Sequence, residues 1–470
     1  MSKLAKNTAI YAIGDIIPKL LNLITFPIMT SNLSTGDFGI INYINSIEAF
    51  LTIVTFLGLK TYYLVYYYKM PNEEEQKKLL GNITLFILGF NLLLTVILTL
   101  LGQPLFKSLG SGDVGFFPFI FVGILTNFFS ILSVLPSALY RVRENPLPLT
   151  IINAVKGFLI MVLTWWWVVR KPSAITVLNI KLIVSVVFGI FFLYITFKNS
   201  ILKFNWKQLK KALAFSLPLV PGDVAYYLSS MSDRILIERY LSVEVLGIYS
   251  VAATLAGMLN ILGYGAYKAF EPYFFKTYGH PTFVKSFEKV RDILLYILLI
   301  LALCLTAFSK EFVQIFAKPE YGEAYIYVLP LTLGVVINTL SIMYATVLTA
   351  QSRTKVCAAI SILCAVVSVV LNILLLPRIG VWSSVIATIV INLLTYVLAK
   401  YISKVKTTNN SFTILIATFL LFSPISVLIN TENLVLSLII KSSLVALFVL
   451  FASFICKLYP LQLIKTMLKK

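Results

Sequence analysis

Charged residues are scarce in this sequence, and so are the residue types that most often build catalytic and metal centres. Asp, Glu, Lys and Arg make up 12% of the 470 residues, about half the roughly 25% typical of soluble domains. Histidine occurs once, as His280, and the four cysteines form no Cys-x-x-Cys pair. No Gly-x-x-x-x-Gly-Lys-Ser/Thr loop is present. A histidine-based metal site and direct ATP drive are therefore not expected, and we predict no cofactor.

What the sequence has in abundance is long apolar runs. Hydrophobic residues make up 59% of the chain, and about 20 apolar residues suffice to cross a bilayer as a helix. Because lipid offers no partner for backbone N–H and C=O groups, only helices and closed barrels span membranes. The runs lack the period-2 alternation of barrel strands, so we predict an all-α integral membrane protein. The first run follows Lys3 and Lys6, has full membrane length and precedes no cleavage site, so it counts as a span and not as a signal peptide. Fourteen spans are predicted, at approximately 8–31, 39–62, 80–101, 116–138, 149–169, 175–197, 213–239, 247–268, 290–309, 325–350, 357–376, 383–400, 411–429 and 434–456.

Lysine and arginine are distributed unevenly between the two sets of loops. With a cytoplasmic amino terminus, 26 of them fall on the cytoplasmic side and 7 on the other. Cytoplasmic loops of membrane proteins carry the excess of positive charge. The pattern predicts that both termini lie in the cytoplasm. It also accounts for the net charge of +20 without a nucleic-acid partner.

Two segments 208 residues apart are similar. Leu33-Ser34-Thr35-Gly36-Asp37-Phe38-Gly39-Ile40 follows the first span, and Leu241-Ser242-Val243-Glu244-Val245-Leu246-Gly247-Ile248 follows the seventh. Gly14-Asp15 and Gly222-Asp223 stand at the same offset, as do Lys60 and Lys268. We predict two six-helix bundles over 1–200 and 201–406, and an extra helix pair with a tail over 407–470. Parallel repeats of this kind occur in transporters.

Ionisable residues inside predicted spans need a partner or a wet cavity, since each costs about 2.5–3.5 kcal/mol at the bilayer centre. Asp15 and Lys19 are four residues apart in the first span, with Pro18 between them. Asp223 occupies the matching place in the seventh span, beside Pro221 and Gly222. An acid next to a helix breaker in both repeats is typical of a bending helix, which favours ion coupling or gating. A structural ion pair beside fixed kinks is the alternative.

Lys60 and Lys268 are predicted near the cytoplasmic ends of spans two and eight. They could face a central cavity and hold an anionic group, or snorkel to the surface. Further charges lie within the spans, and their balance is mixed and slightly basic, which favours an anionic substrate over an organic cation. These further charges are Glu48, Lys156, Lys181, Asp233, Arg234, Glu238 and Lys441.

Three segments carry a resemblance to a known family. They are the Leu33–Ile40 segment, the block Ser232-Asp233-Arg234-Ile235-Leu236 with the following Leu241-Ser242 and Gly247-Ile248-Tyr249-Ser250, and the loop holding Arg141 and Arg143. Together they resemble the bacterial polysaccharide-transport and O-antigen flippases, within the group that includes multidrug extrusion proteins and the lipid II flippase. The resemblance implies two bundles around a cavity, alternating access, and a cargo of one oligosaccharide repeat on undecaprenyl pyrophosphate. Fourteen helices favour lipid-linked sugar flippases over the twelve-helix multidrug proteins.

On this basis we predict a flippase of the bacterial cytoplasmic membrane that serves cell-surface polysaccharide synthesis. Lys60 and Lys268 would neutralise the pyrophosphate, with Lys19 and Arg234 as secondary contacts. Asp15 and Asp223 would couple transport to H⁺ or Na⁺, or gate the bundles. Membrane lipid, a polysaccharide polymerase and chain-length machinery are the expected partners. The alternatives are a lipid II flippase and a multidrug or organic-cation antiporter. A membrane enzyme is disfavoured because every predicted outer loop is short.

Overall fold

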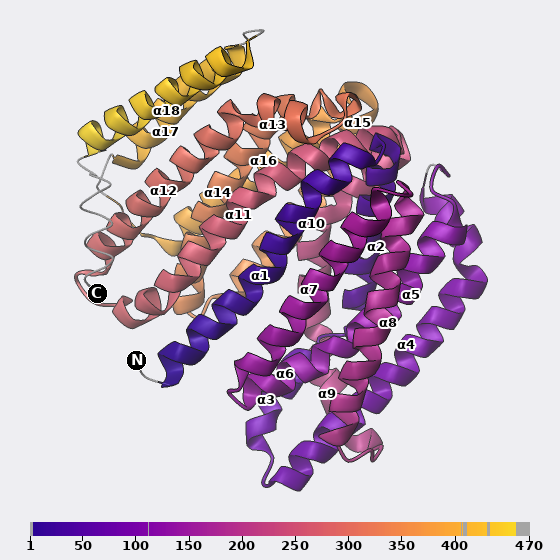
Figure 1. Ribbon diagram of the computed structural model, residues 1–470. Helices are drawn as coiled ribbons and strands as arrows, with labels where there is room; N and C mark the ends of the chain where they lie inside the picture. Colours follow the sequence, from indigo (N-terminus) through magenta and orange to yellow (C-terminus); the bar gives the residue numbers. More distant parts are fainter. Residues whose placement is uncertain (1–2, 111, 406, 408–410, 430–432, 457–470) are drawn as a thin grey trace. The chain divides into compact units, whose positions relative to one another are not determined.

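The computed structural model describes residues 3–110, 112–405, 407, 411–429 and 433–456, and its regular secondary structure there is helical (Figure 1). Eleven stretches of the described residues are long and apolar enough to cross a membrane. The shorter apolar helix α17 and the more polar helices α1 and α10 complete the fourteen predicted spans. The predicted all-α membrane class is therefore confirmed.

The chain divides into two compact units, each described here by itself. Unit 1 comprises residues 1–247 and 376–380, and unit 2 comprises 248–375 and 381–470. The helices up to the boundary are α1 (Lys3–Asn32), α2 (Thr35–Phe56), α3 (Leu59–Tyr66), α4 (Glu73–Leu109), α5 (Phe121–Ser130), α6 (Val134–Val142), α7 (Pro146–Val168), α8 (Ala174–Lys198), α9 (Trp206–Ser216) and α10 (Val220–Tyr240). The remaining helices are α11 (Val243–Thr277), α12 (Phe283–Ala307), α13 (Ser309–Phe316), α14 (Ala324–Ala350), α15 (Thr354–Ile379), α16 (Trp382–Ser403), α17 (Ser411–Leu428) and α18 (Leu434–Cys456).

Side-chain caps begin several of the unit 1 helices. Ser34 accepts a hydrogen bond from the backbone N–H of Asp37 and begins α2, and Ser173 accepts one from Thr176 and begins α8. Such caps satisfy backbone donors that the first helical turn leaves unpaired. The carboxylate of Asp37 also accepts a hydrogen bond of 2.7 Å from the backbone N–H of Ala174. One residue of the repeated segment therefore joins the starts of α2 and α8.

The predicted second span, 39–62, is divided in the structure. Helix α2 ends at Phe56, and both following residues, Leu57 and Gly58, have left-handed backbone angles, with φ of 49° and 69°. Gly58 also lies close to the backbone of Ser216, because a Cβ placed on it would be 3.0 Å from the Ser216 carbonyl oxygen. Lys60 consequently stands on the short helix α3 and not on the end of α2.

The helices of unit 1 pack around α2 and α8. Helix α7 lies between α1 and α8, α5 packs against α2 and α8, and α10 packs against α2 (Figure 1). Two glycines allow the closest helix approach: an added Cβ on Gly39 would be 1.9 Å from the carbonyl oxygen of Val243, and one on Gly247 would be 2.0 Å from that of Thr35. Small residues at helix crossings permit such packing in membranes, where apolar lipid supplies little driving force.

In unit 2, α12 is the most buried of the candidate spans and contacts α14, α17 and α18. Its Arg291 is 2% exposed, pairs with Asp292 at 2.7 Å, and lies over the ring of Phe412 on α17. Another buried ion pair joins α13 to α18: Lys441 lies 2.5 Å from Glu311, whose carboxylate also accepts a hydrogen bond from Ser437. The cation–π contact of Arg291 with Phe412 and the Lys441–Glu311 pair attach the last two helices to the rest of unit 2.

Candidate functional site

A partly buried ion pair between two membrane-spanning helices lies in unit 1. Lys181 on α8 donates a short hydrogen bond to the carboxylate of Glu48 on α2 and another, of 2.7 Å, to the side-chain oxygen of Asn45. The side chain of Glu48 is 12% exposed and that of Lys181 is 30% exposed. Each stands well inside an apolar span. Pairing offsets the cost of placing either charge there.

Helix α5 completes the surroundings of Glu48. The amide nitrogen of Asn127 donates to the backbone oxygen of Glu48 at 3.1 Å and to the hydroxyl of Thr52 at 2.8 Å. One turn earlier, Gly123 leaves room for Ile44, because an added Cβ would lie 2.6 Å from Ile44 Cγ2, and the same position is 3.8 Å from Glu48 Oε1. That oxygen is buried and has no hydrogen-bond partner among the described residues. Glu48 therefore has an open acceptor in a water-poor environment.

A second lysine adds to the charge of this site. Lys156 on α7 is half-buried and lies close enough to Lys181 and Glu48 to interact with both electrostatically. With one carboxylate and two ammonium groups, the set carries one net positive charge. We name these residues, Asn45, Glu48, Asn127, Lys156 and Lys181, the Glu48 cluster. Four helices contribute to it, and its chemistry is that of a small anion site with an internal counter-ion.

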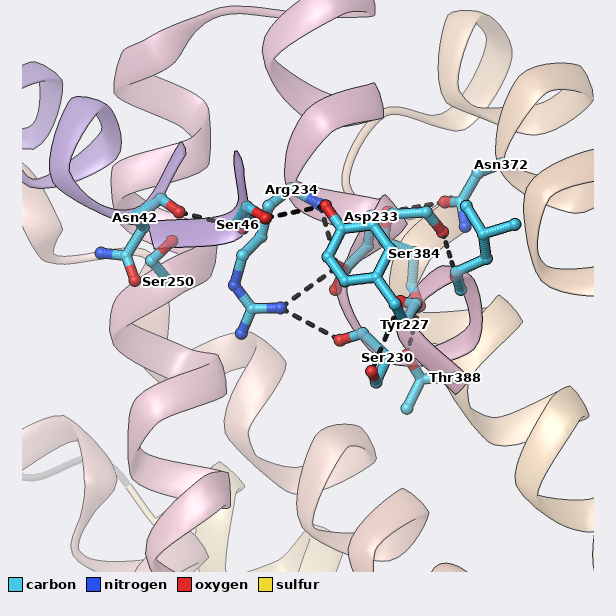
Figure 2. Close-up of polar contacts among 12 residues, drawn as sticks. Asn42, Ser46, Tyr227, Ser230, Asp233, Arg234, Ser250, Asn372, Ser384 and Thr388 are labelled. Atoms are coloured by element: carbon cyan, nitrogen blue, oxygen red, sulfur yellow. Dashed lines mark hydrogen bonds and ion pairs between the residues drawn. The ribbon is translucent and has the colours of Figure 1, made fainter. Parts of the chain in front are cut away.

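Helix α10 covers α2 beside this cluster. The hydroxyl of Tyr227 donates a 2.9 Å hydrogen bond to the backbone oxygen of Ser46, one turn from Asn42 (Figure 2). The ring of Tyr227 lies 5.3 Å from that of Phe50. Arg234, two turns further along α10, donates to the carboxylate of Asp233 at 3.2 Å and to the backbone oxygen of Ser230 at 3.3 Å (Figure 2). The guanidinium is thus held at the surface of α10 by its own helix.

Polar contacts of a different kind occur in unit 2. Asn372 on α15 accepts a 2.7 Å hydrogen bond from Ser384 on α16, whose backbone oxygen accepts one from Thr388 (Figure 2). Asn372 and Ser384 are both buried and carry no charge. They hold the two helices together without forming an ion site.

The sequence-predicted anion contacts lie in different places. Lys19 is exposed on α1, Lys60 is half-buried on α3, and Arg234 is half-buried on α10, all in unit 1. Lys268 belongs to unit 2, where it is exposed on α11 with its ammonium 4.7 Å from the centre of the Tyr264 ring. The meeting of Lys60 with Lys268 across a cavity stays a prediction.

The structure describes the side chain of only one of the two predicted coupling residues. Asp223 is exposed in the first turn of α10. Asp15 stands in α1, but its side chain lies outside the part that the structure describes. Within the described ranges, no group of three or more His, Cys, Asp and Glu side chains is placed to hold a metal ion.

Sequence reasoning noted Glu48, Lys156 and Lys181 as charges within spans but assigned them no role. They stand in three different spans, so no local spacing links them. The available signal was the excess of lone charges in otherwise apolar runs, because each such charge needs a partner from another helix.

Comparison with known proteins supports both the fold and the family. Residues 4–278 match the sequence model of a family described as polysaccharide biosynthesis protein, and residues 218–374 match that of the MatE family. No curated protein sequence matches the chain. Among solved structures, the lipid II flippase MurJ in an inward closed conformation is similar, with a TM-score of 0.75 and 15% identity over 95% of this chain and 98% of the other.

Two transporters share the fold as well. An inward-facing multidrug resistance MATE transporter of the MOP superfamily has a TM-score of 0.66 at 14% identity, with 83% of this chain and 97% of that chain covered. A MOP superfamily transporter from Pyrococcus furiosus, described as having a binding pocket of reversed polarity, has a TM-score of 0.54 at 15% identity, covering 86% and 96%. The chain thus has the fold of a MOP superfamily flippase or transporter.

Proposed function

Because this chain belongs to the polysaccharide biosynthesis protein family, we propose that it is a flippase for an undecaprenyl-pyrophosphate-linked oligosaccharide repeat unit. It moves this unit from the inner to the outer leaflet of the bacterial cytoplasmic membrane, for assembly into O-antigen, capsule or exopolysaccharide. The excess of lysine and arginine on one side supports a cytoplasmic location for both termini. The two predicted six-helix repeats, 1–200 and 201–406, carry out alternating access. The predicted extra helix pair in 407–470 is present in addition to these repeats.

The observation that carries the proposal is the net positive Glu48 cluster inside the apolar spans of unit 1. A pyrophosphate has several charged oxygens, and lysine ammonium groups bind such oxygens as point charges. Lys156 and Lys181 supply two of these charges where water is scarce. Further positive charges for the headgroup come from the predicted anion contacts Lys60, Lys268, Lys19 and Arg234. The lipid tail stays in the bilayer, so the sugar alone needs a polar route.

Glu48 gives the site a means of coupling to an ion. When a phosphate oxygen binds Lys181, it replaces the carboxylate of Glu48 as the partner of that ammonium. An unpaired carboxylate is costly in a medium of low dielectric constant, so Glu48 then binds a proton or Na⁺. Release of the cargo restores the Glu48–Lys181 pair and returns the ion. Asp15 and Asp223 act at the bending helices α1 and α10 in the same cycle.

Two other cargoes are tested by the same experiments. The fold is also that of a lipid II flippase, so a second lipid-linked saccharide is a natural competitor. The match of residues 218–374 to the MatE family model makes a cationic drug the other alternative cargo. A cation site is expected to be net acidic, whereas the Glu48 cluster is net basic, and this difference favours the lipid-linked anion.

The proposal is tested by deleting the protein in its native host and measuring lipid-linked oligosaccharides and surface glycan. We expect single repeat units to accumulate on undecaprenyl pyrophosphate while surface polymer disappears. Complementation with Lys181→Gln should fail to restore the polymer, and Lys107→Gln, which changes an exposed lysine on α4, should restore it. Normal surface glycan with no accumulated intermediate would overturn the proposal, and accumulated lipid II would transfer it to that cargo.

A further inference from the structure

Unit 2 contains a cavity of about 450 Å³ whose lining shares no residue with the Glu48 cluster. Its lining comes from the end of α14 and the loop to α15, the end of α16, and one residue after α11. The volume falls in the range of roughly 300–1,000 Å³ that is usual for small-molecule sites. The lining residues are Tyr278, Ala350, Gln351, Ser352, Arg353, Ile402, Ser403 and Lys404.

The charge of this lining has one sign. Arg353 and Lys404 are basic, the others are polar or apolar, and none is acidic. A cavity lined in this way attracts anions, since none of these described lining residues carries a negative side chain to neutralise the two cations. Arg353 donates through Nη1 to the backbone oxygen of Ile402 at 3.2 Å. That contact uses one of the five N–H donors of a guanidinium, so the group is oriented and still able to bind.

Helix ends would repel an anion if their carbonyl groups were open, because the last carbonyls of a helix carry partial negative charge. Here several of those carbonyls are already occupied. Gln351 donates from its side chain to the backbone oxygen of Ser403 at 2.8 Å, and Arg353 donates to Ile402. Backbone N–H groups of Gln351, Ser352 and Arg353 close the end of α14. The negative ends of α14 and α16 are thereby capped.

Two of the four non-glycine residues with positive φ in the described part of the chain lie at the same place. Ser352 and Lys404 have φ angles of 58° and 56°, in the left-handed region that side chains rarely adopt. Both line the cavity, one from each of the two helix ends. Strained positions of this kind cluster at ligand sites, where the surrounding structure holds them. The shape of the cavity therefore depends on two residues in a costly conformation, one of which also carries a positive charge.

We propose that this cavity binds a phosphate group, held by Arg353 and Lys404, and that the group belongs to the headgroup of an anionic phospholipid. Helices α14 and α16 are membrane spans that end at the cavity, so lipid headgroups lie at its level, and Tyr278, Ala350 and Ile402 provide apolar contact beside the two cations. Basic pockets between membrane helices bind anionic headgroups in this manner. The inference does not depend on the cargo of the flippase or on the Glu48 cluster.

The test is thermal unfolding of the purified full chain in detergent, titrated with phosphatidylglycerol, phosphatidylcholine or inorganic phosphate. We expect phosphatidylglycerol to raise the midpoint of unfolding in a saturable way, and phosphatidylcholine to leave it unchanged. The double variant Arg353→Gln and Lys404→Gln should weaken the apparent affinity for phosphatidylglycerol by about tenfold or more. The matched control, Arg378→Gln with Lys318→Gln, changes two cations outside the cavity and should bind as the parent does.

Each outcome decides the matter. An equal response to inorganic phosphate, lost in the double variant, would confirm the phosphate site but overturn its assignment to lipid. No saturable response to either phosphate source, or an equal response in the double variant, would overturn the site. If the double variant does not fold, Lys404→Gln alone should still lower the affinity, and an unchanged affinity would contradict the proposal. Because binding is measured without transport, failure here leaves the proposed flippase activity untouched.

Discussion

The α-carbon of Gly39 faces the carbonyl oxygen of Val243 so closely that an added Cβ would lie 1.9 Å from that oxygen. The relationship is reciprocal, because a Cβ on Gly247 would lie 2.0 Å from the backbone oxygen of Thr35. Gly39 and Gly247 are 208 residues apart, and so are Thr35 and Val243. Each close approach thus joins a glycine of one repeated segment to a backbone oxygen of the other. The starts of α2 and α11 therefore meet at these two glycines.

Alanine at either glycine should destabilise the protein. Gly39→Ala or Gly247→Ala forces the two backbones apart, and overpacking of this kind costs about 1–3 kcal/mol. Gly257→Ala is the matched control on α11, since its added Cβ meets nothing within 4 Å. The measurement is the thermal midpoint of each variant in detergent. Equal midpoints for Gly247→Ala and Gly257→Ala would show that the close approach is not needed.

The ion pair of the Glu48 cluster predicts a non-additive double variant. Lys181→Met leaves a carboxylate inside the spans, and we expect a loss of about 1–2 kcal/mol, less than for a fully buried pair because Lys181 is 30% exposed. Glu48→Gln combined with Lys181→Met should recover most of the loss. The free energies of unfolding of the parent, the two single variants and the double variant give the coupling energy between the two side chains. Strictly additive losses would mean that the two side chains do not interact.

Asn127 is predicted to position Glu48 without contacting cargo. Asn127→Leu removes the hydrogen bonds to the backbone of Glu48 and to Thr52, which should cost about 1–3 kcal/mol because buried acceptors lose their donor. The maximal rate of transport should fall, while the cargo concentration that gives half of the maximal rate should stay the same. The check is initial rates over a range of cargo. A weaker apparent affinity at an unchanged maximal rate would instead make Asn127 a cargo contact.

The Glu311–Lys441 pair predicts a pH dependence of stability. Burial tends to raise the pKa of the Glu311 carboxyl, but hydrogen bonds from Lys441 and Ser437 outweigh it and hold the pKa below the ordinary value of about 4.5. The folded state therefore gains stability from the ionised carboxylate at pH values above the unfolded pKa, and this gain is lost as pH falls through the lower, folded pKa.

Accordingly, Glu311→Gln should be less stable than the parent at pH 7, and the difference should shrink below about pH 4.5. Thermal midpoints between pH 7 and pH 3 measure it. Glu323→Gln, which alters an exposed carboxylate in the same unit, should show no such convergence. A difference between Glu311→Gln and the parent that is constant across this range would contradict the role of the carboxylate.

The sequence was sufficient for the membrane class and the family, because these depend on features that are local or periodic. Long apolar runs predict spans whatever their packing, whereas the repeat around Gly39 and Gly247 stays a prediction from sequence similarity. It was also sufficient to show that Lys441 stood in an apolar run. Its partner could not be predicted, because Glu311 is 130 residues away and meets it through the packing of α13 and α18.

The candidate site was harder to predict for the same physical reason. Asp15 and Lys19 drew attention because they share a helix face, while Glu48 and Lys181 are separated by 133 residues and have no local relationship. The break after Phe56 was missed as well. Leu57 adopts a left-handed conformation that leucine rarely takes, so the composition around Gly58 gave only a weak indication that Lys60 would stand on a separate helix.

The central claim is that this protein moves a pyrophosphate-linked saccharide by way of Lys181. The most direct measurement reconstitutes the purified protein in liposomes with lipid-linked oligosaccharide extracted from the deletion strain, and follows the accessibility of the sugar to a membrane-impermeant glycosidase. The account predicts that the headgroup crosses the bilayer with the parent protein and with Lys107→Gln, and at least about tenfold more slowly with Lys181→Gln. Equal rates for protein-containing and empty liposomes, or an undiminished rate for Lys181→Gln, would contradict it.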